Sequence, residues 1–549
     1  MKAYPKLTRW LAGLVTVGVF AVIVIVVVVA RNAAKTDNTP AGKGKDAPEV
    51  KASATSWPMF GGSASRNMVN PFAKNLPAKW DVDNKTNIKW SADLGSKAYG
   101  GPVVAGGKVF VGTNNMKPRD PKFTVNKDGK LEPIDMGVLM AFSEDKGDFL
   151  WQRVYAKLKA GRVNDWPVEG LCATPVVEGD RLYFTSNRCE VICAPVAGGE
   201  PHWKLDMIKE LRVFPHNITA CSPLLVGDKL FIVTANGVDE DHINVPAPRA
   251  PSFLCLNKKD GKVIWQNNNP SKMLLEVPKK GDQKSFFKRL VNRGELLQHG
   301  QWSNPAYAVV NGLPQVIFPG GDGWIYSLEP GTGKLIWKFD CNPKDAEYAL
   351  KTGPRSDFIA TPVIYDDKVY IGIGQDPEHG LGVGHLWCID MTKKGDVSPE
   401  LVTDAGKFPP KTKPNPNSGK VWHYGGKADR NKIGRDYYFG RTMSTCAIHD
   451  DLLYVAELAG HLHCLDAKTG KAHWVFDAKS EIWSSPYYAD GKIYLGTDND
   501  TLFVLAHGKQ MKLLAENDMG SAVRATPVAV NGTLFVMTEN KLFAIAEKK

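Results

Sequence analysis

A pattern of short apolar strands recurs about eight times along the chain and constrains its fold more than any other feature. Each unit opens with a small residue, usually followed by proline, as in GGPVV at 100–104, ATPVV at 173–177 and ATPVI at 360–364. Two further strands follow, rich in the β-branched and aromatic residues that buried strands prefer. The spacing from Pro486 to Pro527, about 41 residues, matches one four-stranded propeller blade.

The fourth strand of most units carries a tryptophan after a turn. These tryptophans are Trp151, Trp203, Trp265, Trp337, Trp422 and Trp474. The turn often reads Thr-Gly-Lys or Asp-Gly-Lys, where glycine supplies a backbone conformation that other residues resist. The seventh unit lacks this tryptophan, and the chain ends after the third strand of the eighth unit.

The missing last strand is expected to come from the N-terminal side, where Ile88-Lys89-Trp90 has the same pattern. Such closure would leave few exposed sheet edges. The sequence therefore predicts an all-β protein, an eight-bladed β-propeller of four-stranded antiparallel blades over residues 57–549. Its N-terminal strand closes the last blade, and the blade tryptophans, Trp90 included, are structural.

The N-terminal residues predict a membrane anchor. The uncharged apolar run from Leu11 to Ala30 is long enough to cross a bilayer core of about 30 Å. Basic residues before it favour a cytoplasmic stub at 1–9, a transmembrane anchor or signal-anchor at 10–30, and an extracytoplasmic propeller. A cleaved signal peptide is the alternative. Residues 31–56 have no aromatic residue and predict a disordered linker.

The segment LDAKTGKAHW at 465–474 resembles the tryptophan-docking motif of quinoprotein-like, or PQQ-repeat, β-propellers. Trp265 and Trp337 carry shorter versions, and WPMFGG at 57–62 resembles large propeller families of planctomycete-type bacteria. The resemblance covers about residues 57–549. Such propellers include quinone-dependent alcohol dehydrogenases and the non-enzymatic propeller subunit of the outer-membrane barrel assembly machinery, so the resemblance implies the fold and leaves both functions open.

Long insertions are expected on one face of the propeller, called here the loop-rich face. Second-to-third and fourth-to-first connections share a face because the strands alternate in direction. The long connections of these two kinds are 113–137, 234–252, 373–385, 156–171, 266–302 and 423–443. Loops of this length usually carry function or are disordered, so this face is the expected binding face.

Residues that lead into the inner strands on this face should ring the central channel. The candidates for ligand or partner binding are His216, Asn217, Gln301, Trp302, Arg355, Asp357, Arg441, Trp483 and Arg524. Three arginines with aromatic walls would suit an anionic or planar ligand. The alternative is that the charges pair with one another, or with solvent, around a water-filled channel.

Other motifs are interpreted as structural. Cys193, Cys255, Cys388 and Cys464 occupy the middle of the third strand in their units, where other units place small or apolar residues. His379 and His385 could join Asp376 or Glu378 around a metal ion, but histidines in a loop are more often solvated. No metal site is predicted. The formal charge of +11 favours anionic neighbours, yet no nucleic-acid-binding motif is present.

These observations favour a monomeric, membrane-tethered periplasmic propeller of the inner membrane that acts as a binding or scaffolding module, with a possible place in envelope protein assembly. The expected partner is a protein, peptide or glycan, with no cofactor, no nucleic acid and no catalytic residue. The alternative is an alcohol or sugar dehydrogenase that uses pyrroloquinoline quinone and calcium, with Asp357 as the base beside Arg355, Asn217 and Trp302. Against it, the chain has neither an adjacent cysteine pair nor a Cys-x-x-Cys-His haem motif.

Overall fold

The computed structural model describes residues 50–242, 244–271, 299–344, 346, 355–404 and 409–547. The stub at 1–9, the anchor at 10–30 and most of the linker lie outside these residues and stay predictions. Within the described part of the chain, no helix is both long and apolar enough to cross a bilayer.

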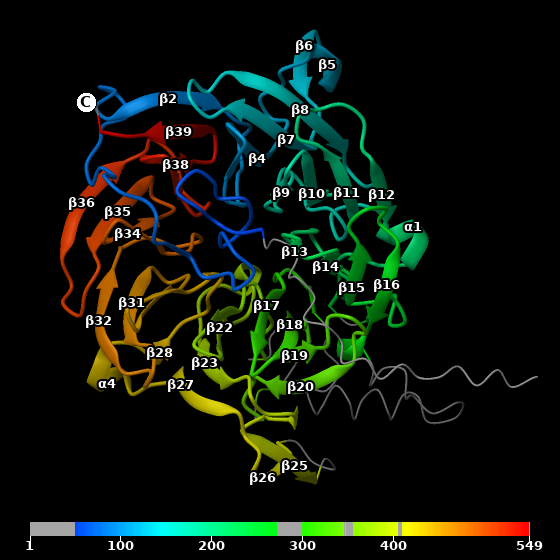
Figure 1. Ribbon diagram of the computed structural model, residues 1–549, viewed down its shortest axis with the longest axis vertical. Coiled ribbons are helices and arrows are strands. Elements are labelled where there is room, and N and C mark those ends of the chain that lie inside the picture. The colour runs from blue at the N-terminus through cyan, green and yellow to red at the C-terminus, as the bar shows by residue number, and fades with distance from the viewer. Residues whose placement is uncertain are drawn as a thin grey trace, which may run out of the picture. The chain divides into compact units, whose positions relative to one another are not determined.

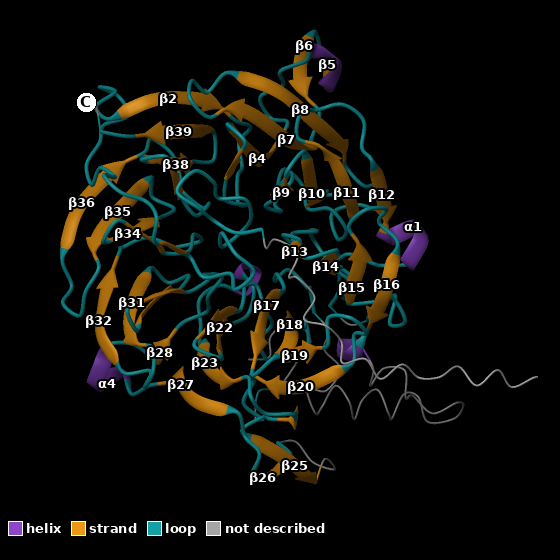
Figure 2. Ribbon diagram, in the orientation of Figure 1, coloured by secondary structure: helices purple, strands orange, loops and turns teal. Residues whose placement is uncertain are grey.

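The described strands form eight blades around an axis, with only short helices (Figures 1 and 2). Blades 1 and 2 are, from axis to rim, β3 (Val103–Ala105), β4 (Lys108–Asn114), β7 (Met136–Ser143) and β8 (Phe149–Ala156), then β9 (Val176–Glu178), β10 (Arg181–Thr185), β11 (Glu190–Pro195) and β12 (Trp203–Asp206). Blades 3 and 4 are β13 (Leu224–Val226), β14 (Lys229–Val233), β15 (Phe253–Asn257) and β16 (Val263–Asn267), then β17 (Ala306–Val310), β18 (Leu313–Pro319), β19 (Trp324–Leu328) and β20 (Leu335–Asp340).

The other half of the ring repeats the plan. Blades 5 and 6 are β21 (Val363–Tyr365), β22 (Lys368–Ile373), β23 (His385–Asp390) and β27 (Lys420–Lys427), then β29 (Ala447–His449), β30 (Leu452–Ala456), β31 (His461–Asp466) and β32 (Ala472–Asp477). Blades 7 and 8 are β33 (Tyr487–Ala489), β34 (Lys492–Gly496), β35 (Thr501–Ala506) and β36 (Leu513–Asp518), then β37 (Val528–Val530), β38 (Thr533–Met537), β39 (Lys541–Ile545) and β2 (Ile88–Asp93).

Smaller elements decorate the blades. They are the edge strands β24 (Gly395–Asp396) and β28 (Tyr437–Phe439), the hairpins β5 (Thr124–Lys127) with β6 (Lys130–Pro133) and β25 (Glu400–Asp404) with β26 (Lys411–Pro414), the helices α1 (Met207–Leu211) and α4 (Arg430–Ile433), and the 3-10 turns Pro121–Phe123, Asn269–Ser271 and Pro377–His379. The 3-10 turn Pro377–His379 belongs to a loop that reaches the axis, so it matters for the site described below.

The ring closes as predicted. Strand β2 pairs antiparallel with β39, with Trp90 opposite Ala544, so blade 8 combines strands from both ends of the propeller. The indole N–H of Trp90 donates to the carbonyl of Glu144 in blade 1, at 3.0 Å. Closure therefore rests on a shared sheet and on a hydrogen bond to the next blade.

The same tryptophan contact joins most neighbouring blades. The indole N–H groups of Trp151, Trp203, Trp265, Trp422 and Trp474 donate to the carbonyls of Val196, Lys258, Pro330, Ala467 and Gly508 in the blade that follows. Trp337 differs, because its N–H donates to Gln315 Oε1 at 2.7 Å and the Gln315 amide then donates to the Met391 carbonyl. All seven predicted blade tryptophans are thus structural.

Glycine in the turn makes this contact possible. Gly333 has a φ of +69°, and a Cβ added there would lie only 2.7 Å from the ring of Trp265. A side chain at this position would meet both a strained backbone and a steric clash. The Gly in the Thr-Gly-Lys turns is therefore required by indole packing as well as by the turn.

A belt of polar side chains links the blades around the axis. Its members precede the proline-like position of each inner strand, and the hydrogen bonds run from Thr174 N to Ser222 Oγ (3.0 Å), Ser222 N to Asn304 Oδ1 (2.5 Å), Asn304 Nδ2 to Thr361 Oγ1 (2.7 Å), Thr361 N to Thr445 Oγ1 (3.3 Å), Thr445 N to Ser485 Oγ (2.9 Å) and Ser485 N to Thr526 Oγ1 (3.0 Å). Each hydroxyl or amide satisfies a buried polar group of its neighbour. This explains why a small polar residue opens most of the units.

The segment 54–70, which we call the plug, crosses one end of the axial channel (Figure 1, dark blue). Its carbonyls accept backbone hydrogen bonds from inner strands of several blades, including those of Val177, Tyr307, Ile364 and Tyr488. Its last two residues form β1 (Val69–Asn70), which pairs parallel with β33. These paired residues lie within the inner strands, beyond the strand starts on the loop-rich face, so the plug lies toward the opposite end of the channel.

Residues 50–56 belong to the predicted linker, but in the structure some of them are hydrogen-bonded to this assembly. The carbonyl of Ala54 accepts the N–H of Asn531, and the N–H of Ala52 donates to Gly62. Trp57, the expected start of order, is only 1% exposed and forms a β-bridge with Val104. Backbone hydrogen bonds to the ring order this stretch, and such bonds cannot be predicted from amino-acid composition.

Arg66 holds the plug against the blades. Its guanidinium is fully buried and donates to four backbone carbonyls, those of Phe60, Ser222, Pro223 and Pro305. Burial lowers the pKa of Arg66 to about 10, so the group is still charged near neutral pH. One side chain thereby satisfies acceptors from the plug and from blades 3 and 4.

Replacing Arg66 should destabilise the propeller strongly. The substitution Arg66→Met keeps an unbranched apolar stem but leaves four buried carbonyls without their donor, so we expect the free energy of unfolding to fall by at least about 3 kcal/mol. Urea unfolding followed by tryptophan fluorescence measures this. Arg249→Met, at an exposed arginine, is the matched control and should change stability little. Equal stability of the two variants would contradict the role assigned to Arg66.

Candidate functional site: the axial cavity

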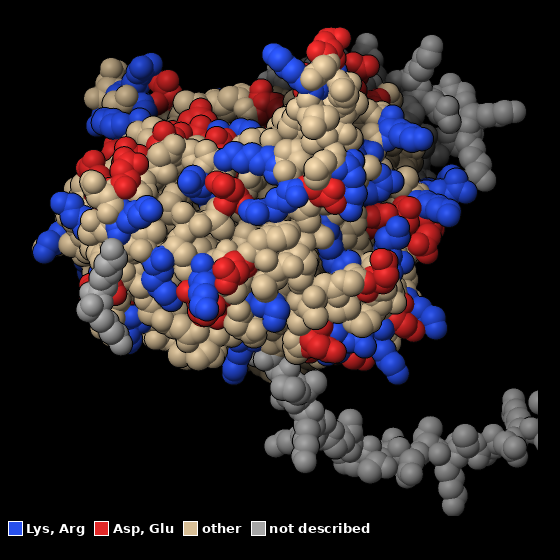
Figure 3. Space-filling view, turned by 90° about the horizontal axis from the view of Figure 1, so that it is seen from above, with Lys and Arg blue, Asp and Glu red and all other residues tan. Residues whose placement is uncertain are grey.

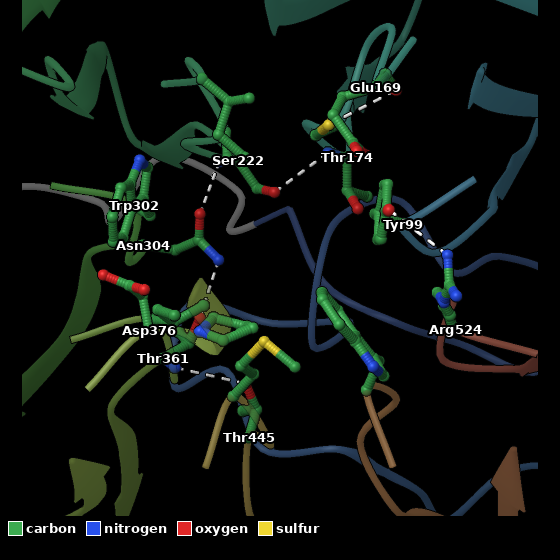
Figure 4. Close-up of a pocket in the computed structure, with 18 of the residues that line it drawn as sticks. Tyr99, Glu169, Thr174, Ser222, Trp302, Asn304, Thr361, Asp376, Thr445 and Arg524 are labelled. Atoms are coloured by element: carbon green, nitrogen blue, oxygen red, sulfur yellow. Dashed lines mark hydrogen bonds between the residues drawn. The ribbon is translucent and has the colours of Figure 1, made fainter. Parts of the chain in front are cut away.

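A cavity of about 330 Å³ lies on the axis, between the plug and the loops of the loop-rich face (Figure 4). Phe60 of the plug and members of the polar belt, such as Ser222 and Thr445, belong to its lining. Most of the remaining wall comes from residues just before the inner strands. The aromatic side chains of this wall are Tyr99, Trp166, Trp302 and Trp483.

The basic side chain in the lining, Arg524, is already paired. It contacts Asp498 at 2.5 Å and Glu539 at 2.7 Å, and its guanidinium lies 5.2 Å from the ring centre of Trp483. Burial lowers the pKa of Arg524, but hydrogen bonds and charge from Asp498 and Glu539 outweigh burial and raise it. Arg524 therefore acts mainly as a fixed partner of these two carboxylates.

Three carboxylates also line the cavity, namely Glu169, Asp376 and Glu378. Burial tends to raise the pKa of Asp376, but the hydrogen bond from His379 Nδ1, at 3.0 Å, helps to lower it to about 2. Burial raises the pKa of Glu378, whose Oε1 accepts the Asn217 amide at 3.1 Å. Since the guanidinium is compensated elsewhere, the cavity is net acidic near neutral pH.

Four of the nine predicted site residues line this cavity: Asn217, Trp302, Trp483 and Arg524. The other two arginines do not join Arg524. Arg355 donates to the Asp322 carbonyl at 2.8 Å, and Arg441 donates to carbonyls of the 373–385 loop and to Gln375. The expectation that three arginines converge on the channel is therefore not met, because nearby backbone carbonyls bind two of them.

The remaining three predicted residues, His216, Gln301 and Asp357, are buried behind the wall. Gln301 donates to the carbonyl of Asn236, at 2.7 Å. His216 packs against Trp302, whose indole N–H donates to the His216 carbonyl at 3.0 Å. Burial and two neighbouring histidines lower the pKa of His216 to about 3, so its imidazole is neutral.

Those neighbours are His242 and His299, which are not among the residues predicted from the sequence. The three ring centres lie 4.8 to 4.9 Å apart, and all three side chains are buried. His299 Nδ1 lies 2.7 Å from Asp357 Oδ2. The carboxylate outweighs the opposing effect of burial, so the pKa of His299 is raised, whereas burial raises the pKa of Asp357.

The metal grouping that the sequence suggested is not assembled. His379 bonds to Asp376, whereas His385 Nδ1 lies 2.9 Å from His423 Nε2 in the neighbouring strand β27. His242 and His299 were missed because both lie in long connections, where alignment to the blade repeat gives no position. From the sequence one could predict only that the connections that contain them belong to adjacent blades and lie on the same face.

The nine cysteines are all buried and free in the structure. Cys193, Cys255, Cys388 and Cys464 lie in third strands with almost no exposure, as predicted for core positions. Cys172 lines the axial cavity, where burial raises its pKa, so the thiol is protonated at neutral pH. An unreactive packing role follows for these thiols.

Comparisons with known proteins agree with the architecture. Curated relatives include the quinohemoprotein alcohol dehydrogenase ADH-IIG of Pseudomonas putida, 24% identical over 180 residues, and tetrathionate hydrolase of Acidithiobacillus ferrooxidans, 20% identical over 346 residues. These alignments cover 30% and 57% of this chain, and 25% and 62% of the relatives. The chain thus spans about a quarter and about three fifths of the two relatives it matches.

Solved structures show the same fold. A europium-containing methanol dehydrogenase matches with a TM-score of 0.54 and 14% identity, over 89% of this chain and 90% of the other. The structure of ADH-IIG matches with a TM-score of 0.54 and 13% identity, over 91% and 83%. At such identities the likeness establishes the fold alone.

A family model described as outer membrane protein assembly factor BamB matches residues 124–267 and 414–549, about half of the chain. The matched segments contain complete blades from both halves of the ring and include the docking tryptophans Trp203, Trp265 and Trp474. The chain therefore belongs to the PQQ-repeat β-propeller family that this model represents.

Proposed function

We propose that this protein is an extracytoplasmic binding or scaffolding propeller that receives a segment of a partner polypeptide in its axial cavity. The observation that carries this proposal is the cavity itself, an aromatic-walled, net acidic space backed by the plug. Because a ring of eight hydrogen-bonded sheets holds the cavity wall rigidly, the wall loses little conformational entropy when a partner binds. The family description, an outer membrane assembly factor, supports a role in envelope protein assembly.

The chemistry of the wall favours a basic side chain as the buried part of the partner. Glu169 and Glu378 supply negative charge, and Trp166, Trp302 and Trp483 supply π-faces that attract cations. Lysine and arginine combine an apolar stem with a charged head and so match both features. A glycan that stacks on the tryptophans is the competing partner that a test must separate.

The N-terminal residues fit this role as a tether. An anchor at 10–30 would hold the propeller at the periplasmic side of the inner membrane, with the linker setting its reach. Nucleic acid is not the partner that we propose, and on the side drawn in Figure 3 basic and acidic side chains are interspersed. An extended basic surface would be needed for such binding.

Peptide binding tests the proposal. In a panel of matched, end-blocked pentapeptides that carry Lys, Arg, Gln or Glu at the centre, we expect Lys and Arg peptides to bind at least about tenfold more tightly than the Glu peptide. Isothermal titration calorimetry measures the dissociation constants. The double substitution Glu169→Gln and Glu378→Gln should reduce the preference markedly, because it removes two of the three lining carboxylates without changing side-chain size and leaves Asp376.

Glu200→Gln is the matched control, since Glu200 is exposed on the turn between β11 and β12, at the opposite face. It should keep the wild-type preference. Trp483→Ala should weaken binding of the whole panel. The proposal fails if the wild type does not distinguish the peptides, or if neutral oligosaccharides bind in place of all of them.

The alternative of a quinone-dependent dehydrogenase is poorly matched by the residues present. Pyrroloquinoline quinone carries three carboxylates, whereas the lining offers three acidic groups and Arg524, which is already paired. Asp357, the base considered from the sequence, is buried against His299 and does not line the cavity. The cavity therefore disfavours this anion electrostatically.

We accordingly expect no saturable quinone absorbance and no dye reduction when the purified protein is mixed with pyrroloquinoline quinone, calcium and simple alcohols or sugars. Visible absorbance during a quinone titration measures binding, and dye bleaching measures turnover. Saturable binding together with turnover would replace the binding-module proposal with an oxidoreductase.

A further inference from the structure

Three loops of the loop-rich face bring a buried group of imidazoles together behind the cavity wall. His216 precedes the inner strand of blade 3, His242 lies in the connection from β14 to β15, and His299 precedes the inner strand of blade 4. One ring nitrogen from each lies within 4.8 Å of the other two. Residues far apart in sequence thus present three metal-ligand atoms at one point.

The hydrogen bond of His216 leaves one nitrogen lone pair of its ring inside the group. His216 Nδ1 lies 2.9 Å from the Val238 carbonyl, which can only accept, so Nδ1 carries the proton. The other nitrogen, His216 Nε2, is buried without a hydrogen-bond partner. An unpaired buried imidazole nitrogen is costly unless a ligand satisfies it.

His299 is oriented in a similar way. Its Nδ1 faces Asp357 Oδ2 at 2.7 Å, and its Nε2 faces the interior of the group, so a proton held on the Asp357 side would leave Nε2 able to bind a metal ion. There Nε2 lies 3.2 Å from His242 Nδ1, close to the separation of two nitrogens that share a tetrahedral ion at about 2.0–2.1 Å. In many metal sites the second ring nitrogen of a metal-bound histidine donates a hydrogen bond to a carboxylate, as His299 could to Asp357.

Two buried carboxylates, Asp357 and Asp376, lie beside the group and would offset part of the charge of a bound cation. Asp357 Oδ1 and Asp376 Oδ2 are buried without hydrogen-bond partners, and Asp376 Oδ2 lies 3.6 Å from His299 Nδ1. A second grouping of ligand atoms, His299 with Asp357 and Asp376, is less suitable. Its nitrogen and oxygen are already in direct contact at 2.7 Å, which leaves no room for an ion between them.

We propose that His216, His242 and His299 bind one divalent transition-metal ion, with zinc as the best match to three neutral imidazoles. Asp357 and the Val238 carbonyl position two of the ligands, and Asp376 is the nearby group able to supply negative charge. The site is separate from the axial cavity, and the inference does not depend on the peptide-binding proposal. The sequence alone does not predict this site, because His242 and His299 lie in long connections that have no counterpart in the blade repeat.

Metal analysis of the purified full chain, prepared without a histidine tag, tests the site. After removal of metal with a chelator, we expect the protein to take up one Zn²⁺ per chain. X-ray absorption of the bound zinc should show nitrogen ligands at about 2.0–2.1 Å and imidazole scattering. Sulfur ligands, or no tight binding, would overturn the proposal.

Variants separate ligands from positioning residues. His216→Gln and His242→Gln should weaken zinc binding by more than about 100-fold, and Asp357→Asn by about 10- to 100-fold. His202→Gln, at an exposed histidine on the opposite face, is the control and should bind as the wild type does. Unchanged affinity in His216→Gln would contradict the assignment.

Zinc should also raise the thermal midpoint of the wild type and of His202→Gln, since an ion that binds only the folded state stabilises it. Asp357→Asn keeps all three ligands, so it reports on the site even if a ligand variant folds poorly. A zinc-dependent stabilisation that persists in both ligand variants would place the ion elsewhere and refute the proposal.

Discussion

The whole architecture depends on the pairing of β2 with β39. The last sheet of the ring takes its outer strand from the other end of the repeat region, so one sheet holds both ends of the propeller together. The antiparallel register from Ile88 to Asp93 provides this strand, and the Trp90 indole bonds the closed sheet to blade 1. With the ring closed, every inner strand starts at the same face, which places the polar belt, the cavity and the histidine group.

Much of this could be predicted from the sequence because each blade repeats the same physical requirements. Alternating apolar strands, a glycine turn and a docking tryptophan recur with a regular spacing, so the blades and their closure were predicted correctly. The plug escaped prediction because it is not a repeat. Its order comes from backbone bonds to many inner strands and from Arg66, whose four acceptors are distant in sequence.

The site was predicted less well for a related reason. Their position in the blade repeat indicates that Arg355 and Arg441 approach the axis. It does not indicate which groups their guanidinium ends will bind. Carbonyls of neighbouring loops bind both, so the guanidinium cluster does not form. The overall charge of +11 also pointed to anionic partners, whereas the cavity is acidic. Net charge describes the protein as a whole, whereas the electrostatic potential in a buried site is set by the few charged groups that line it.

The histidine group and the cavity share a wall. Trp302 lines the cavity while its indole N–H holds the His216 carbonyl, and Asp376 lines the cavity while its carboxylate approaches His299. A metal ion on the three imidazoles would lie directly behind Trp302, whose ring packs against His216, and close to Asp376, which approaches His299. Because Trp302 and Asp376 face the space where a partner would lie, metal binding and partner binding should be thermodynamically coupled, each strengthening the other if both favour the same wall geometry.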